Sequence, residues 1–263
     1  MALRRRLARA VFLVIFVGTA GTMTVTAQGI TDPAVPDSAL DRVDRLRAEG
    51  QFQKARAALQ VLRGQYGDPV ALLWRASFTQ VDLGKVAQEK EKAHPHHQTA
   101  NALADSALTV DSTNARAHLA KAVAEGRLAL DAGTKERVRR SRQIKTHADR
   151  AIELDSTLAD AFHVRGRWNR EVSDLNFFER TVVKTIYGGL PESSFEQAVE
   201  DFTTALSLED VRFHHLELAK TYLKMDREDD ARTHLNRVLA LPKKEYFGDR
   251  YKEEAQTLLN ELE

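Results

Sequence analysis

Apolar and small residues recur along this chain at the three- and four-residue spacing of amphipathic helices, and the segments that carry them come in pairs. Within residues 144–202, small or apolar residues stand where two antiparallel helices would touch, at Ala148, Ala151, Phe162 and Gly166. Helix pairs that repeat along a chain are typical of helical-repeat proteins, in which each pair buries its apolar face against the next.

We therefore predict an all-α, tetratricopeptide-like (TPR-like) solenoid of about five helix pairs with a C-terminal capping helix. A small residue late in the first helix of each pair and another early in the second align the pairs. The expected helices are Leu40–Glu49 with Phe52–Tyr66, Val70–Leu83 with a partner containing Ala100, Ala104 and Ala107, Ala115–Leu130 with Lys135–Leu154, Leu158–Ser173 with Phe195–Leu208, Val211–Met225 with Asp229–Leu241, and the cap Asp249–Leu262.

In the three inner pairs, more residues separate the aligned small residues of the first and second helix than in the outer two pairs. All three extensions fall on the same edge of the stack. The first two, Lys85–Lys92 and Lys135–Arg142, are charged and helix-friendly, so we expect them to lengthen the hairpins. We expect Gly84 to end the helix before the first of them. The third extension is apolar and includes Phe177–Tyr187.

Two pair boundaries resemble each other, since residues 110–114 read Val-Asp-Ser-Thr-Asn and residues 154–157 read Leu-Asp-Ser-Thr. We expect these Asp, Ser and Thr side chains to accept hydrogen bonds from the first turn of the following helix.

Several motifs between about residues 102 and 259 are similar to those of the regulator of microtubule dynamics family. They are K-E-R-V-R-R-S-R-Q-I-K-T-H-A-D-R-A-I-E-L, G-R-W at 166–168, F-E-R at 178–180, I-Y-G-G-L-P-E-S-S and E-Q-A-V-E-D-F. The first pair and the segment before it lie outside this resemblance. The resemblance implies an all-α repeat fold and an adaptor role, and we do not carry the microtubule function over to this chain.

The N-terminus has the pattern of a secretory signal peptide. Four arginines precede an apolar run, Ala10–Val17, and Val25-Thr26-Ala27 offers small residues for cleavage. We predict a signal peptide over 1–27, a flexible linker over 28–38 and the repeat domain over 39–263. The protein would then be secreted or periplasmic. An uncleaved inner-membrane anchor facing the periplasm is the alternative, although the apolar run is short for a spanning helix.

Composition narrows the function classes. The 263 residues include no Cys, which excludes disulfides, thiolate metal sites and Cys nucleophiles. Four of the 39 Lys and Arg and none of the 38 acids lie in residues 1–27, so the remainder has 35 cations against 38 acids and a net charge of −3. A near-neutral chain has no global attraction to nucleic acid.

The sequence holds no strong catalytic, metal or cofactor motif. No G-x-S-x-G elbow, phosphate-binding P-loop or H-E-x-x-H motif occurs, so we expect no enzyme and no cofactor. His94, His96 and His97 crowd around Pro95, and we expect a solvated loop there rather than a metal site. His214 and His215 should point to different sides of a helix.

A basic stretch, Lys135–Lys145, contains six cations and one acid. The cations spread around a helix axis and no aromatic residue lies among them for base stacking, so we favour a solvated face over a nucleic-acid site. An acidic protein or a lipid headgroup is the better functional alternative.

The apolar extension allows two interpretations. Phe178, Val182 and Ile186 share one helical stripe with Leu175 close by, and Phe177 belongs to the same apolar segment. We favour packing onto the neighbouring repeat, and the alternative is a wall for an apolar ligand such as a lipid.

The first helices of the pairs should line a concave groove. By our alignment the groove side chains are Arg127, His163, Arg167, Arg170, Glu171, Lys220 and Lys224. Because most of them are cationic, we predict a non-enzymatic scaffold that binds an acidic or carboxylate-ended peptide. The alternative is a carrier of a lipid or other apolar ligand.

Overall fold

The computed structural model describes residues 34–87 and 89–262, and all regular secondary structure within them is α-helical. In chain order the helices are α1 (Asp37–Ala48), α2 (Phe52–Tyr66), α3 (Val70–Val86), α4 (Lys90–Val110), α5 (Ala115–Leu130), α6 (Thr134–Leu154), α7 (Ala159–Ser173), α8 (Phe177–Tyr187), α9 (Phe195–Leu208), α10 (Arg212–Lys224), α11 (Glu228–Ala240) and α12 (Gly248–Glu261).

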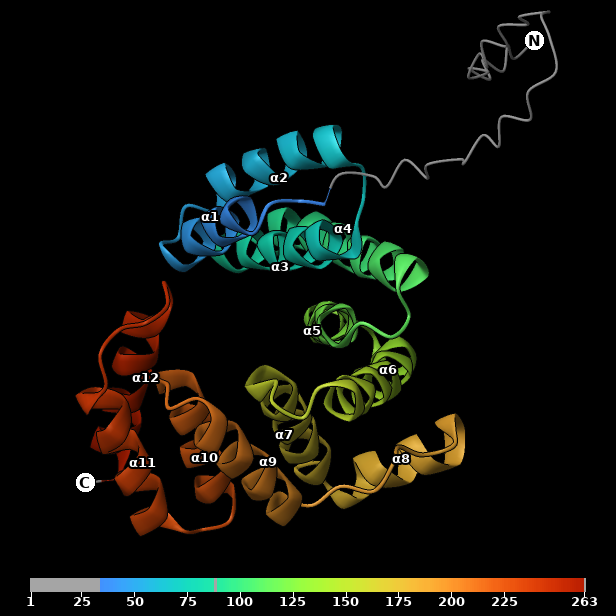
Figure 1. The fold of residues 1–263 in the computed structure, drawn as a ribbon. Helices are drawn as coiled ribbons and strands as arrows, with labels where there is room; N and C mark the ends of the chain where they lie inside the picture. The colour runs from blue at the N-terminus through green and yellow to red at the C-terminus, as the bar shows by residue number, and fades with distance from the viewer. Residues whose placement is uncertain (1–33, 88, 263) are drawn as a thin grey trace, which may run out of the picture. The chain divides into compact units, whose positions relative to one another are not determined.

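These helices form the predicted solenoid. The hairpins α1–α2, α3–α4, α5–α6, α7–α9 and α10–α11 follow one another, and α12 packs on α10 and α11 (Figure 1). The first helices of successive hairpins contact each other and lie on the inner side of the curved stack. The second helices lie on the outer side, and α8 is the apolar extension between α7 and α9.

Small residues occupy the helix contacts, as the pattern predicts. Ala104, Ala148, Ala198 and Ala231 are fully buried, because the helices approach too closely there for a larger side chain. At the contact of α7 with α9, a Cβ on Gly166 would lie 3.1 Å from the ring of Phe202.

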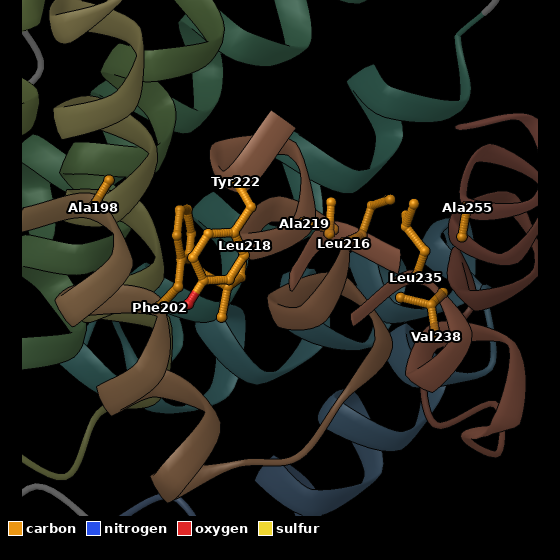
Figure 2. Packing of buried hydrophobic residues seen from close by; sticks show 10 residues of the cluster. Ala198, Phe202, Leu216, Leu218, Ala219, Tyr222, Leu235, Val238 and Ala255 are labelled. Carbon is orange, nitrogen blue, oxygen red and sulfur yellow. The ribbon is translucent and has the colours of Figure 1, made fainter. Parts of the chain in front are cut away.

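The largest apolar cluster fills the C-terminal repeats. Phe202 of α9 packs with Leu216 and Leu218 of α10, and the cluster continues to Leu235 of α11 and Ala255 of α12 (Figure 2). This packing makes α12 the cap of the stack, since it covers the apolar face that α11 would otherwise expose.

The second hairpin corrects two expectations. Gly84 does not end α3, which continues to Val86. The glycine is instead needed for packing, since its missing side chain leaves the space that the ring of His97 fills. A Cβ on Gly84 would lie 2.3 Å from Nε2 of His97. The His94–His97 segment is not a loop, since it belongs to α4. Pro95 lies early in that helix, where it removes one backbone donor without ending the helix.

The two similar pair boundaries share one turn. Oδ1 of Asp111 accepts hydrogen bonds from the N–H and hydroxyl of Thr113 at 2.9 and 2.7 Å, and Asp155 does the same with Thr157 at 2.9 and 2.6 Å. The aspartates thus close the turn itself. The first turn of α5 is capped instead by Asn114, whose side chain accepts from the N–H of Ala117.

The first and last repeats contact each other through a group that we call the clasp: Gly50, Phe52, Tyr246 and Phe247. The ring centroids of Phe52 and Tyr246 are 5.2 Å apart, and those of Phe52 and Phe247 are 5.9 Å apart. Gly50 has a φ of +76°, and a Cβ there would lie 2.0 Å from the Tyr246 ring. The contact closes the solenoid of residues 34–262 on itself.

Candidate functional site

The inner surface of the solenoid carries the predicted groove residues. Arg127 lies on α5, the residues from His163 to Glu171 lie on α7, and Lys220 and Lys224 lie on α10. The contact between α7 and α10 brings most of them together. The structure thus collects the predicted set in one region, but it gives the members different environments.

Glu217 of α10, which the sequence did not single out, is the centre of this region. Its Oε2 accepts from Nη2 of Arg170 at 2.6 Å and lies 3.4 Å from Nε of Arg167, while its Oε1 accepts from Lys220 at 3.1 Å. Burial raises the pKa of Glu217, but Arg167, Arg170 and Lys220 outweigh that effect and hold it far below its ordinary value. The carboxylate therefore stays charged and neutralises part of the predicted cationic surface.

Two histidines extend this buried network. Nδ1 of His163 on α7 lies 2.9 Å from Nδ1 of His214 on α10, and both side chains are buried. Burial lowers the pKa of His214 to about 3, and burial together with His214 lowers that of His163 well below 6.5. Both rings are neutral near pH 7, so His163 adds no positive charge to the groove.

The outlying groove residues are also paired. Lys220 reaches Glu254 of α12 at 2.5 Å, Lys224 reaches Asp174 at 2.8 Å, and Glu171 reaches Arg170 at 2.9 Å. Arg170 itself is 6% exposed, and it donates to the backbone carbonyl of Glu217 as well. These contacts hold the inner helices together, and the binding role of the residues stays a prediction.

Arg127 differs from the others, because its side chain makes no hydrogen bond or ion pair with another described residue. Burial, with Arg167 and Arg250 nearby, lowers its pKa to about 10. Burial and the charge of Arg127 likewise lower the pKa of Lys85 on α3 to about 8. Four helices therefore direct cations toward one part of the inner surface: Lys85, Arg127, Arg167 and Arg250.

Lys85 and Arg250 were missed in the sequence for a simple reason. They stand in a predicted extension and in the predicted cap, which the alignment did not assign to the groove. Lys85 also lies 5.0 Å from the ring centroid of Phe247 in the clasp. Both residues reach the inner surface because the clasp brings the first and last repeats together. The alignment of single helix pairs cannot predict this contact between distant repeats.

Four further histidines contact neighbouring helices. Nδ1 of His96 lies 2.7 Å from Oε1 of Gln80, and His97 is buried against Gly84. His214 and His215 point to different sides of α10, as predicted, since His215 lies 2.8 Å from His234. Across residues 34–87 and 89–262, no group of three His, Asp or Glu side chains is placed to hold a metal ion.

The basic stretch divides into paired and exposed cations. Glu136 binds Arg139 at 2.6 Å and Arg140 at 2.7 Å, and Arg140 also reaches the buried Glu125. Lys135 is exposed, and Arg139 remains more than half exposed despite its pairing. Part of this helix is therefore fixed to α5, and part of it carries positive charge into solvent.

The apolar extension does not pack as we favoured. Phe177, Phe178 and Ile186 are 86%, 73% and 65% exposed, so they project into solvent. Val182 is half-buried, and Val183 alone in α8 is buried. The stripe predicted as a packing face or ligand wall is thus an open apolar surface. None of the described helices is long and apolar enough to cross a membrane.

Comparison with known proteins matches this geometry. Residues 39–263 match the family described as Regulator of microtubule dynamics protein 1-3, so the match includes the first hairpin, which the sequence motifs had left outside. The chain is 27% identical to Regulator of microtubule dynamics protein 3 of Xenopus laevis over 183 residues, 68% of this chain and 39% of that protein. It is 26% identical to protein 1 of Mus musculus over 227 residues, 85% of this chain and 73% of that protein.

Among solved structures, a thermophilic TPR protein of Thermus thermophilus superposes with a TM-score of 0.61 at 19% identity, covering 84% of this chain and 98% of that one. This likeness supports the TPR-like fold. The matched part spans 39% of the length of the Xenopus laevis relative.

Proposed function

The chain belongs to the family of regulator of microtubule dynamics proteins 1-3, and from that premise we propose that it is a non-enzymatic scaffold whose inner surface binds a protein partner. TPR-like solenoids expose an extended curved surface that suits peptides and partner segments. The relatives' name concerns microtubule dynamics, and we propose only the scaffold role for this chain.

Arg127 is the observation that carries the proposal. It is a partly buried cation whose side chain has no anionic partner at hydrogen-bond distance among the described residues, and burial, together with Arg167 and Arg250 nearby, lowers its pKa to about 10. A carboxylate placed there would relieve the repulsion among these cations. We therefore propose that the partner presents an acidic side chain or a C-terminal carboxylate. Such a charge-assisted hydrogen bond contributes about 1.5–3 kcal/mol.

An array of acidic peptides, each paired with its Glu-to-Gln counterpart, tests this site. We expect the protein to bind acidic members and Arg127→Glu to weaken that binding by about tenfold or more. Arg150→Glu, a change of the same charge on an exposed residue of α6, is the control and should leave binding unchanged. Equal binding by the two variants would contradict the groove assignment.

The location of the protein is a second part of the proposal. We propose that residues 1–27 are a signal peptide and that the mature protein is secreted or periplasmic. These residues lie outside those that the structure describes. N-terminal sequencing of protein from the native host should begin at Gln28, and an intact Met1 would favour the membrane-anchored alternative.

The carrier of an apolar ligand remains the alternative function. The open apolar side of α8 favours it, because a ligand or a second surface could cover Phe178 and Ile186. Native mass spectrometry of gently purified protein would detect a co-purifying lipid, and its absence would argue against this alternative.

A further inference from the structure

Helix α8 has its own N-terminal cap and is hydrogen-bonded to α6 at its C-terminal end, although it buries little of itself. At its start the side chain of Asn176 accepts from the N–H of Glu179 at 3.0 Å, and Glu179 accepts from the N–H of Asn176 at 2.9 Å. At its end Arg142 of α6 donates to the carbonyls of Tyr187 and Gly189. The cap favours a preformed helix, and the contacts with Arg142 hold its C-terminal end to α6.

The outer side of this helix is apolar and open. Phe177 and Phe178 stand next to each other at 86% and 73% exposure, and Ile186 lies two turns beyond Phe178 on the same face. No other phenylalanine among the described residues is exposed to this degree. Apolar surface in contact with water is unfavourable by about 25 cal/mol per Å², so a capped helix that presents three large exposed apolar side chains indicates a partner.

Positive charge lies beside this face. Arg142 contacts the end of α8, and Arg139 and Lys135 stand three and seven residues before it, so the three share one side of α6. Lys135 and Arg139 are exposed. Lys184 adds a further exposed cation on α8, while the acid of α8, Glu179, is engaged in the cap. Exposed cations thus lie beside the apolar face, and the one acid in the first turns of α6, Glu136, is paired with Arg139 and Arg140.

We propose that α8 and the first turns of α6 form a docking surface for a membrane that contains anionic lipids. A short amphipathic helix with aromatic residues on one side and Lys or Arg beside it lies in the lipid–water interface, with its apolar side chains among the acyl chains. Nearby cations add attraction to anionic headgroups. Side chains that are 65–86% exposed, as these three are, insert into a fluid bilayer without a complementary pocket, which a protein partner would have to supply.

Vesicle co-sedimentation of the full chain tests the apolar part. The protein is mixed with phosphatidylcholine vesicles that do or do not contain phosphatidylglycerol. We expect Phe177→Ser with Phe178→Ser to weaken binding to the anionic vesicles by about tenfold or more. Val61→Ser, which changes an apolar residue of α2 that is 68% exposed, should bind like the unchanged protein. Because every variant keeps residues 1–33, the difference between variants reports on α8 alone.

A charge pair of variants tests the cationic part. Lys135→Glu with Arg139→Glu should abolish the preference for phosphatidylglycerol, whereas Lys54→Glu with Lys252→Glu, which alters net charge equally on other exposed residues, should preserve it. Circular dichroism checks that all variants stay helical. Equal lipid preference in both double variants would overturn the cationic part of the proposal.

The depth of insertion distinguishes lipid from a protein partner. Brominated lipids quench tryptophans that enter the acyl region. Phe178→Trp should therefore show quenching beyond that of the unchanged protein, and Val61→Trp should not. If Phe178→Trp is quenched no more than Val61→Trp, or if Phe177→Ser with Phe178→Ser leaves binding unchanged, the membrane proposal is wrong and the apolar face serves a protein.

Discussion

Soluble proteins usually bury apolar side chains and expose charged ones. The contact of α7 with α10 and the helix α8 both depart from this rule, in opposite ways. Between α7 and α10, Arg170, His163 and Glu217 are at most 9% exposed; Arg170 and Glu217 form an ion pair, and the neutral His163 contacts His214. On α8, two phenylalanines are more than 70% exposed. The same chain thus buries charge in one region and exposes aromatic surface in another.

The difference between the two regions lies in pairing. Buried charges are tolerated where each has a partner at hydrogen-bond distance, as Arg170 has in Glu217 at 2.6 Å. Exposed apolar residues gain nothing comparable from the solenoid. The charged residues of the first region therefore stabilise the fold, whereas the exposed apolar residues of α8 indicate a binding function. The predictions below test this assignment.

The largest expected effect follows removal of the central carboxylate. Glu217→Ala should lower the free energy of unfolding by about 3–5 kcal/mol, because Arg170 would stay buried without its partner. Urea denaturation followed by circular dichroism measures the change. Glu171→Gln removes the other, exposed partner of Arg170 and should change stability by less than about 1 kcal/mol. Similar losses in both variants would mean that the network is not organised around Glu217.

Acid should weaken the same region. Burial lowers the pKa of His214 to about 3 and that of His234 to about 4, and both regain an ordinary value near 6.5 on unfolding. The unfolded chain then binds more protons than the folded chain below pH 6.5. Stability should therefore fall as the pH drops from about 6.5 toward 4, by about 2–3 kcal/mol or more in total.

Denaturant titrations across this pH range measure the loss. His214→Phe removes one titrating ring and should flatten the dependence. The exposed cations and phenylalanines of α8 should not contribute, so Phe178→Ser should keep the slope of the unchanged protein. A flat profile between pH 6.5 and 4.5 would contradict the buried, neutral state of the histidine pairs.

The close approach of α7 and α9 gives the next prediction. Gly166→Leu should cost about 1–3 kcal/mol, since a Cβ already meets Phe202 at 3.1 Å and Asp201 at 3.2 Å. Gly64→Leu on α2 is the matched control. A Cβ there meets nothing within 4 Å, so the change should be neutral or slightly stabilising in a thermal melt.

The smallest effect should come from the open face of α8. Phe178→Ser is expected to change the free energy of unfolding by less than about 0.5 kcal/mol, because the ring is 73% exposed. Val183→Ser on the opposite side of the helix should cost about 1–3 kcal/mol. If Phe178→Ser proved as costly as Val183→Ser, the phenylalanine would have a structural role after all.

The repeating part of the fold could be predicted from the sequence, because small residues at helix contacts are a local pattern. Ala148, Gly166 and Ala198 all lie at the expected contacts. The capping helix could be predicted as well, since its apolar residues fall on one face. The interpretation of Gly84 as a helix end was wrong. A glycine is needed at this position because the ring of His97, which belongs to another helix, packs against it.

The site was harder to predict for the same physical reason. Helical spacing shows which residues share a side, but it does not show what faces them. The role of Glu217 depends on the packing of α10 beside α7, which helical spacing does not show. In the structure Glu217 pairs with Arg170 and Lys220, which the sequence predicted as free cations. The spacing predicted the apolar stripe of α8 correctly. The same spacing occurs whether another helix covers the stripe or solvent does, so it could not predict the exposure of Phe178 and Ile186.

The clasp has a consequence for how the molecule comes apart. In a linear array the terminal units have one neighbour each, so they fray first and unfolding spreads inward. Here Phe52 and Tyr246 make the two terminal units neighbours, and Arg212 holds the loop that carries Tyr246 by donating to the carbonyls of Leu241 and Gly248. Within residues 34–262, there is no terminal repeat that lacks a second neighbour and from which unfolding would start, so the amides of these residues should exchange with solvent in one concerted opening.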